Sequence, residues 1–108
     1  MDSNGRYVLD ANGVPVEEPD LMKWAQWLET ADRRVAVDTV NHFRVSTVFL
    51  GLDHRFGRRG PPLLFETMVF YEGTARDQLC CRYATREQAE QGHKEIVARA
   101  TNDPVSLL

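Results

Sequence analysis

Residues 45–71 read VSTVFLGLDHRFGRRGPPLLFETMVFY. Two runs rich in β-branched and aromatic residues, 44–53 and 63–72, flank a loop that carries arginines, glycines and two prolines. Such runs, separated by turn-forming residues, are typical of two strands joined as a hairpin. We therefore expect this central hairpin to organise the rest of the domain.

The two predicted strands of this hairpin are apolar on both of their alternating sets of residues. A half-exposed antiparallel strand should instead alternate apolar and polar residues. Helices can cover one face, but too little chain remains to cover the other. We therefore expect the second face to meet a ligand or a partner subunit, most simply in a homodimer or higher homo-oligomer through the central hairpin.

Two helices and further strands are predicted outside the hairpin. Residues 19–31 carry an apolar stripe at helical spacing, formed by Leu21, Trp24, Ala25 and Leu28. The sequence TREQ, which begins at Thr85, matches a capping box and predicts the start of a second helix. Small residues at positions 89 and 92 would let this helix lie close to the sheet.

Strands are also predicted at residues 34–40 and 79–83, and the Asn12-Gly13 turn predicts a short hairpin near the N-terminus. The order β(β)-α-β-β-β-β-α indicates an α+β fold, with a mostly antiparallel sheet of four or five strands and two helices packed on one face. The 108 residues fit a single domain. Residues 1–18 would form an N-terminal hairpin or arm, and residues 103–108 a C-terminal tail.

Composition narrows the function classes. Hydrophobic residues make up 43% and the net charge is −3, which indicates a globular chain and argues against general nucleic-acid binding. The polar N-terminus lacks a signal-peptide h-region, and no apolar run approaches the roughly 18 residues of a membrane span. The adjacent cysteines Cys80 and Cys81 are poorly placed to bridge each other, so we expect two thiols in a reducing, intracellular setting.

The basic loop is the first candidate site, because guanidinium forks suit phosphates or carboxylates and aromatic faces stack on flat ligands. For a small anionic ligand the candidate binding residues are His54, Arg55, Phe56, Arg58, Arg59, Trp24 and Trp27. The competing interpretation is a solvated loop whose arginines pair with the excess acids, with both tryptophans as core anchors. No Walker-type loop or GxGxxG occurs.

Asp53, His54 and Glu66 form the second candidate site. A carboxylate beside an imidazole is the minimum for general acid–base catalysis, and with Glu66 it could hold a divalent metal. An arginine partner would explain Glu66 without any catalysis. No zinc pattern is present, and the sequence calls for no cofactor and no metal. His93 is predicted to be a core or interface histidine and His42 a turn residue, while one of the two cysteines should be buried and the other exposed.

The segments STVFLGLDH (46–54), FG (56–57) and GPPLLFETMVF (60–70) resemble the core of a family of small proteins encoded by bacteriophages and prophages. The resemblance extends to LMKWAQWLETADRRVA (21–36) and RYATREQAEQGH (82–93), and so covers most of residues 20–95. The Arg58-Arg59 pair is a less typical filling of the loop. The resemblance implies a phage accessory protein in the cytoplasm of the bacterial host, and it supplies no activity.

Three functions from different classes are therefore consistent with the sequence. The first is a non-catalytic accessory binding protein, for example a counter-defence inhibitor that sequesters a nucleotide signal or a host protein. The second is a small hydrolase or metal-dependent enzyme that uses Asp53, His54 and Glu66. The third is a virion or morphogenesis component. Detection of the protein in purified phage particles would indicate this function.

Overall fold

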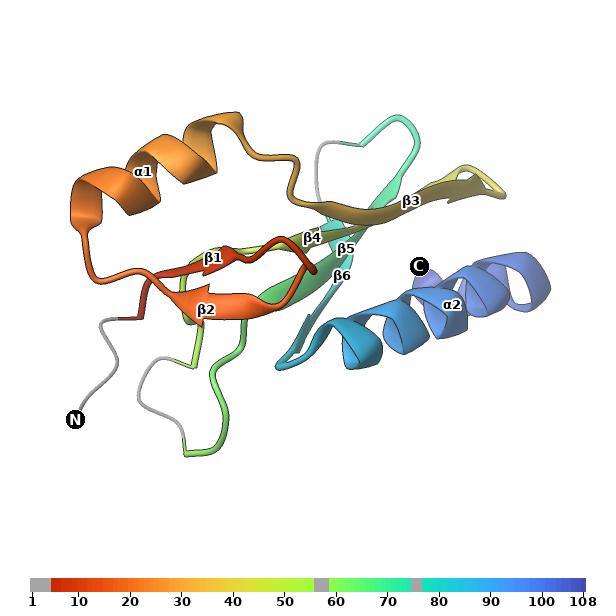
Figure 1. Ribbon diagram of the computed structural model, residues 1–108. Helices are drawn as coiled ribbons and strands as arrows, with labels where there is room; N and C mark the ends of the chain where they lie inside the picture. The colour runs from red at the N-terminus through yellow and green to blue at the C-terminus, as the bar shows by residue number, and fades with distance from the viewer. Residues whose placement is uncertain (1–4, 56–58, 75–76) are drawn as a thin grey trace.

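The central sheet is antiparallel, as predicted. The structure, a computed structural model, describes residues 5–55, 59–74 and 77–108, apart from the side chain of Asp77. Within these residues the main sheet has the order β3-β4-β5-β6 (Figure 1). Its strands are β3 (Arg34–Val40), β4 (Phe43–Phe49), β5 (Phe65–Tyr71) and β6 (Asp77–Tyr83). The α+β class with a mostly antiparallel sheet is thus confirmed.

The remaining elements precede and follow this sheet. Strands β1 (Tyr7–Leu9) and β2 (Pro15–Glu17) form the predicted N-terminal hairpin. Helix α1 (Leu21–Thr30) follows, and α2 (Arg86–Asn102) and the short 3-10 helix η1 (Pro104–Leu107) end the chain. In Figure 1 α2 runs beside the main sheet, and α1 lies near the β1–β2 hairpin, away from α2.

Both helices begin at side-chain caps. The Asp20 carboxylate accepts the amides of Met22 and Lys23, so α1 starts at Leu21 rather than at residue 19. At α2 the capping box is confirmed, since the Thr85 hydroxyl accepts the Gln88 amide and the Gln88 side chain reaches back to the Thr85 amide. Each cap satisfies amides that the first helical turn leaves without a partner.

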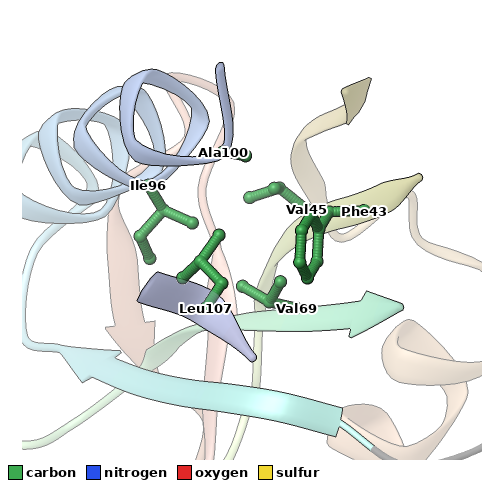
Figure 2. Close-up of a cluster of buried hydrophobic side chains, with 6 residues drawn as sticks. All are labelled: Phe43, Val45, Val69, Ile96, Ala100 and Leu107. Atoms are coloured by element: carbon green, nitrogen blue, oxygen red, sulfur yellow. The ribbon is translucent and has the colours of Figure 1, made fainter. Parts of the chain in front are cut away.

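The core lies on one face of the sheet, where it forms two clusters. One contains Phe43, Val45, Val69, Ile96, Ala100 and Leu107 (Figure 2). The other contains Tyr7, Phe49, Leu64, Phe65 and Ala89, with Trp27 of α1 packed against it. Because α2 contributes to both clusters and α1 to the second, both helices use the same face of the sheet.

Two details of the predicted packing were wrong. Leu21 and Ala25 belong to the exposed side of α1, and the tryptophan beside the predicted stripe, Trp27, makes the edge-on contact with the Phe49 ring. The segment expected to be a tail instead folds as η1 after Pro104, which places Leu107 in the core at 4% exposure.

A buried polar layer separates the two clusters. Thr47 and Thr67 face each other across β4 and β5, share a hydrogen bond between their hydroxyls and are fully buried. His93 Nδ1 lies 2.7 Å from the Thr47 hydroxyl, and its Nε2 lies 2.7 Å from the Asp38 carboxylate. The buried side chains of Thr47, Thr67 and His93 therefore all have partners, as a low-dielectric interior requires. The prediction of a satisfied core histidine is confirmed.

Two glycines allow close contacts. Gly51 has a φ of +78°, and its carbonyl accepts the Tyr7 amide and the Trp24 indole N–H, so it ties β1 and α1 to the end of β4. A Cβ at Gly92 would lie 2.3 Å from the Tyr83 hydroxyl oxygen, so α2 can lie this close to β6 only with glycine there. Burial raises the pKa of the Tyr83 hydroxyl.

We predict that Gly92→Ala lowers the free energy of unfolding, although alanine is the better helix former by about 1 kcal/mol. The added methyl group meets the Tyr83 ring, and overpacking of this kind costs roughly 1–3 kcal/mol. Urea denaturation measures the change. In the same helix, Ala98→Gly at an exposed position should cost about 1 kcal/mol by propensity alone. An unchanged or raised stability of Gly92→Ala would contradict the packing described for α2.

Candidate functional site

Asp53 closes the basic loop. Its carboxylate accepts the backbone amides of Arg55 at 2.8 Å and Leu63 at 3.0 Å, and it pairs with the Arg55 Nε at 2.8 Å. Burial alone would raise the pKa of Asp53, but these amides and the guanidinium outweigh it and hold the pKa below the ordinary 3.8. The carboxylate therefore acts as the link between the two sides of the loop.

The other predicted ligands in the loop are arranged around this link. Arg55 donates to the Gly60 carbonyl at 2.6 Å in addition to Asp53, so its charge and donors are used within the loop. The His54 Nδ1 lies 2.7 Å from the Leu52 carbonyl. Arg59 is exposed. Phe56 and Arg58 lie outside the described residues.

Glu66 is bonded to other partners. Arg82 Nε donates to its carboxylate at 2.8 Å, and the Cys80 thiol donates to the same oxygen at 3.3 Å. This is the arginine partner that the sequence left open as an explanation for a buried carboxylate. Among the residues that the structure describes, no three His, Cys, Asp or Glu side chains gather to hold a metal ion. Asp53, His54 and Glu66 therefore do not form a metal-binding cluster.

Both tryptophans take part in packing. The Trp24 indole N–H donates to the Gly51 carbonyl at 2.8 Å, and the Trp27 ring meets Phe49 edge-on at 5.8 Å between centroids. These contacts fit the interpretation of both residues as core anchors. Neither one stands beside the basic loop in any described contact.

The Asp38–His93–Thr47 chain, which the sequence did not predict, has the order of a catalytic acid, imidazole and hydroxyl. A nucleophile must reach its substrate, however, and Thr47 is fully buried and also bonded to Thr67. The arrangement is therefore a structural hydrogen-bond chain. It depends on pairing between strands and α2 that are far apart in sequence, so no local motif could have indicated it.

The sheet face opposite the core is the open face. Residues that pair across antiparallel strands share a face, so the register assigns its members. The open face consists of Arg34, Val37, Thr39, Arg44, Ser46, Val48, Glu66, Met68, Phe70, Cys80 and Arg82. Both helices lie on the other side, where the buried clusters are. Cys80 is exposed here, and Cys81, on the core side, is only partly buried.

The open face is positively charged around an apolar centre. Val37, Ser46 and Met68 pair across the middle of the face, Val48 lies next to them on the side of the basic loop, and Val37 keeps 38% of its surface exposed. Among the described side chains, three arginines share this face with one carboxylate, Glu66. The whole chain, in contrast, has a net charge of −3. Charge is therefore unevenly distributed, as at surfaces that select a charged partner.

A cavity lies at the end of this face, beside the turn between β3 and β4. It has a volume of about 560 Å³ and is lined by Thr39, His42, Arg44, Phe70, Tyr71, Glu72, Gly73 and Thr74. The Arg44 guanidinium carbon lies 4.7 Å from the centre of the Phe70 ring. His42 is a turn residue, as predicted, and forms an ion pair with Glu72. We call this cavity the turn-end pocket.

Arg44 and Phe70 were not predicted as site residues from the sequence. The sequence did contain one sign that this turn is unusual. Asn-His occupies a two-residue turn in which glycine normally takes the second position. Asn41 and His42 both have positive φ values, 49° and 70°.

Comparisons of the chain with protein-family models, with curated proteins and with solved structures found no match. Within the described residues, no helix is long and apolar enough to cross a membrane. The arrangement of the side chains therefore carries the functional argument.

We predict that Asp53→Asn destabilises the fold near neutral pH by about 1–3 kcal/mol, because the ion pair with Arg55 is lost. The folded pKa of Asp53 is lowered, so its stabilising contribution is complete above the unfolded pKa and disappears as the pH falls through the folded value. The stability difference between wild type and Asp53→Asn should therefore shrink in acid. Urea titrations across the acid range measure it, with the exposed Glu29→Gln as the control. A difference that stays constant with pH would show that Asp53 does not close the loop as a carboxylate.

Proposed function

We propose that the protein is a small non-catalytic binding protein that holds an acidic protein surface on the open face of its sheet. One observation carries the proposal: an apolar centre flanked by arginines lies uncovered by either helix, on a chain whose overall charge is negative. The groups best suited to catalysis are bonded internally instead, to Arg55, Arg82 and Thr47.

The open face has the composition of a binding surface. Buried interface centres are apolar, and arginine is the charged residue most enriched in them. Here Val48 and Met68 supply the apolar part, and Arg34 lies beside Val48 at the end near the basic loop. Arg82 lies at the same end, beside Glu66. Acidic groups on the partner would meet the Arg34 guanidinium, while the partner's apolar side chains would cover Met68.

A homo-oligomer through the same face stays a prediction. Two copies related by a two-fold axis would place the same arginines near one another, and like charges oppose such a contact. The acidic partner avoids this repulsion, which is why it is preferred here. Light scattering of the purified protein over a range of concentrations measures the oligomeric state directly.

The resemblance to small bacteriophage and prophage proteins suggests where the partner belongs. On that basis we propose that it is a bacterial host protein, met in the host cytoplasm, and that the binding inhibits a host defence. The hydrolase or metal-dependent alternative would need Asp53, His54 and Glu66 in one site. The arrangement of Asp53 on Arg55 and Glu66 on Arg82 favours the binding protein.

We predict that Met68→Glu weakens capture of an acidic host protein at least tenfold, which corresponds to about 1.4 kcal/mol. The new carboxylate would stand in the middle of the open face and repel the partner. Affinity capture from host extract, followed by mass spectrometry and titration of the captured protein, measures the effect. Lys94→Glu introduces the same carboxylate, with a larger change of charge, at an exposed position of α2 and should leave capture unchanged.

Two results would count against the proposal. The first is equal capture by wild type and Met68→Glu, which would move the binding surface elsewhere. The second is retention that does not weaken as salt is raised, since attraction between exposed charges is screened by ions. Turnover of a substrate that Asp53→Asn abolishes without unfolding the protein would instead favour the enzyme.

A further inference from the structure

We propose that the turn-end pocket is a separate site for a small ligand that carries one phosphate or carboxylate group on a flat ring. It lies at the end of the open face formed by Arg44 and Phe70, whereas Arg34 beside Val48, and Arg82 beside Glu66, lie at the opposite end. The inference therefore does not depend on the protein partner proposed above.

Arg44 supplies the recognition of the anion. Its guanidinium lies over the Phe70 ring, so one face of this planar group is held against an aromatic ring. The other face of the guanidinium can stack on a flat ring, and its edge presents paired N–H donors to a carboxylate or phosphate. Among the described side chains, no carboxylate forms an ion pair with Arg44. The guanidinium is thus positioned by Phe70 without being neutralised by it.

His42 provides a second, independent observation. Its φ of 70° places it in the left-handed region, which is unfavourable for a residue with a Cβ and natural for glycine. The turn conformation is held by a hydrogen bond from the Glu72 amide to the His42 carbonyl. The imidazole is mostly exposed, so its ion pair with Glu72 contributes little to stability. Strain kept without a gain in stability is characteristic of binding sites.

The size and charge of the pocket define the ligand. Its volume of about 560 Å³ is within the range of small-molecule sites, roughly 300–1,000 Å³. In the lining the Glu72 carboxylate is bonded to the His42 ring, and Arg44 is the permanent cation. One oxyanion group therefore matches the site better than a polyphosphate. The hydroxyl of Thr39, which also lines the pocket, offers a polar contact beside Arg44.

Four probes separate the parts of this ligand. Adenosine monophosphate carries a phosphate and a ring, and benzoate carries a carboxylate and a ring. Inorganic phosphate lacks the ring, and adenosine lacks the anion. We expect adenosine monophosphate or benzoate to bind at least tenfold more tightly than inorganic phosphate or adenosine. NMR shifts of the Arg44 side-chain N–H and the His42 ring measure the binding. Whichever of the two binds more tightly identifies the phosphate or the carboxylate source.

Matched variants test the assignment. Arg44→Gln should weaken binding at least tenfold, while Arg34→Gln, which removes the same charge from the other end of the same face, should leave it unchanged. His42→Gly should weaken binding and raise the urea midpoint, because glycine relieves the left-handed strain. That combination distinguishes a binding residue from a structural one.

The proposal is overturned if no probe produces saturable shifts at the pocket, or if Arg34→Gln weakens binding as much as Arg44→Gln does. A lower midpoint for His42→Gly would show that the histidine is retained for stability alone. The capture experiment with Met68→Glu tests the middle of the open face and not the turn-end pocket. Failure of the protein-binding proposal therefore leaves the small-ligand proposal open to its own test, and the reverse also holds.

Discussion

The structure depends on the register of β4 against β5. In this register Thr47 lies opposite Thr67, and Phe49 lies opposite Phe65. Because successive side chains on a strand point to opposite faces, a slip by one residue would turn Arg44 and Glu66 toward the helices and expose the phenylalanines. The covered face supplies the core, and the same alternation places the charged residues together on the open face. Core and candidate sites are therefore consequences of one pairing.

The buried polar layer makes this register specific. Apolar residues alone would tolerate several pairings, because valine and phenylalanine pack without directional bonds. The Thr47 hydroxyl, in contrast, finds both Thr67 and the His93 ring only when β4, β5 and α2 are aligned as observed. A partly satisfied polar network in the interior is costly, so alternative alignments are penalised. The layer thus links the position of α2 to the pairing of the strands.

The parts of the fold that could be predicted are those fixed by local chemistry. The Thr85 capping box and the small residues of α2 that face the sheet can each be recognised from a few neighbouring residues of the sequence. The exposure of Leu21 and the burial of Leu107 depend instead on where α1 and η1 reach the sheet, which no short pattern contains. The same limit applied to the site. The loop arginines were conspicuous in sequence, whereas the stacking of Arg44 on Phe70 appears only when the strands are paired.

Basic side chains also shelter part of the open face from water. Long basic side chains shelter apolar surface with their stems while the charged ends stay in water. Arg44 covers the Phe70 ring, and Arg82 is bonded to Glu66 on the same face. Arg44, which would recognise an anionic group at the turn end, thus also reduces the exposure of Phe70. A ligand at the turn end would keep Arg44 in place by stacking on its outer plane, so binding there need not uncover Phe70.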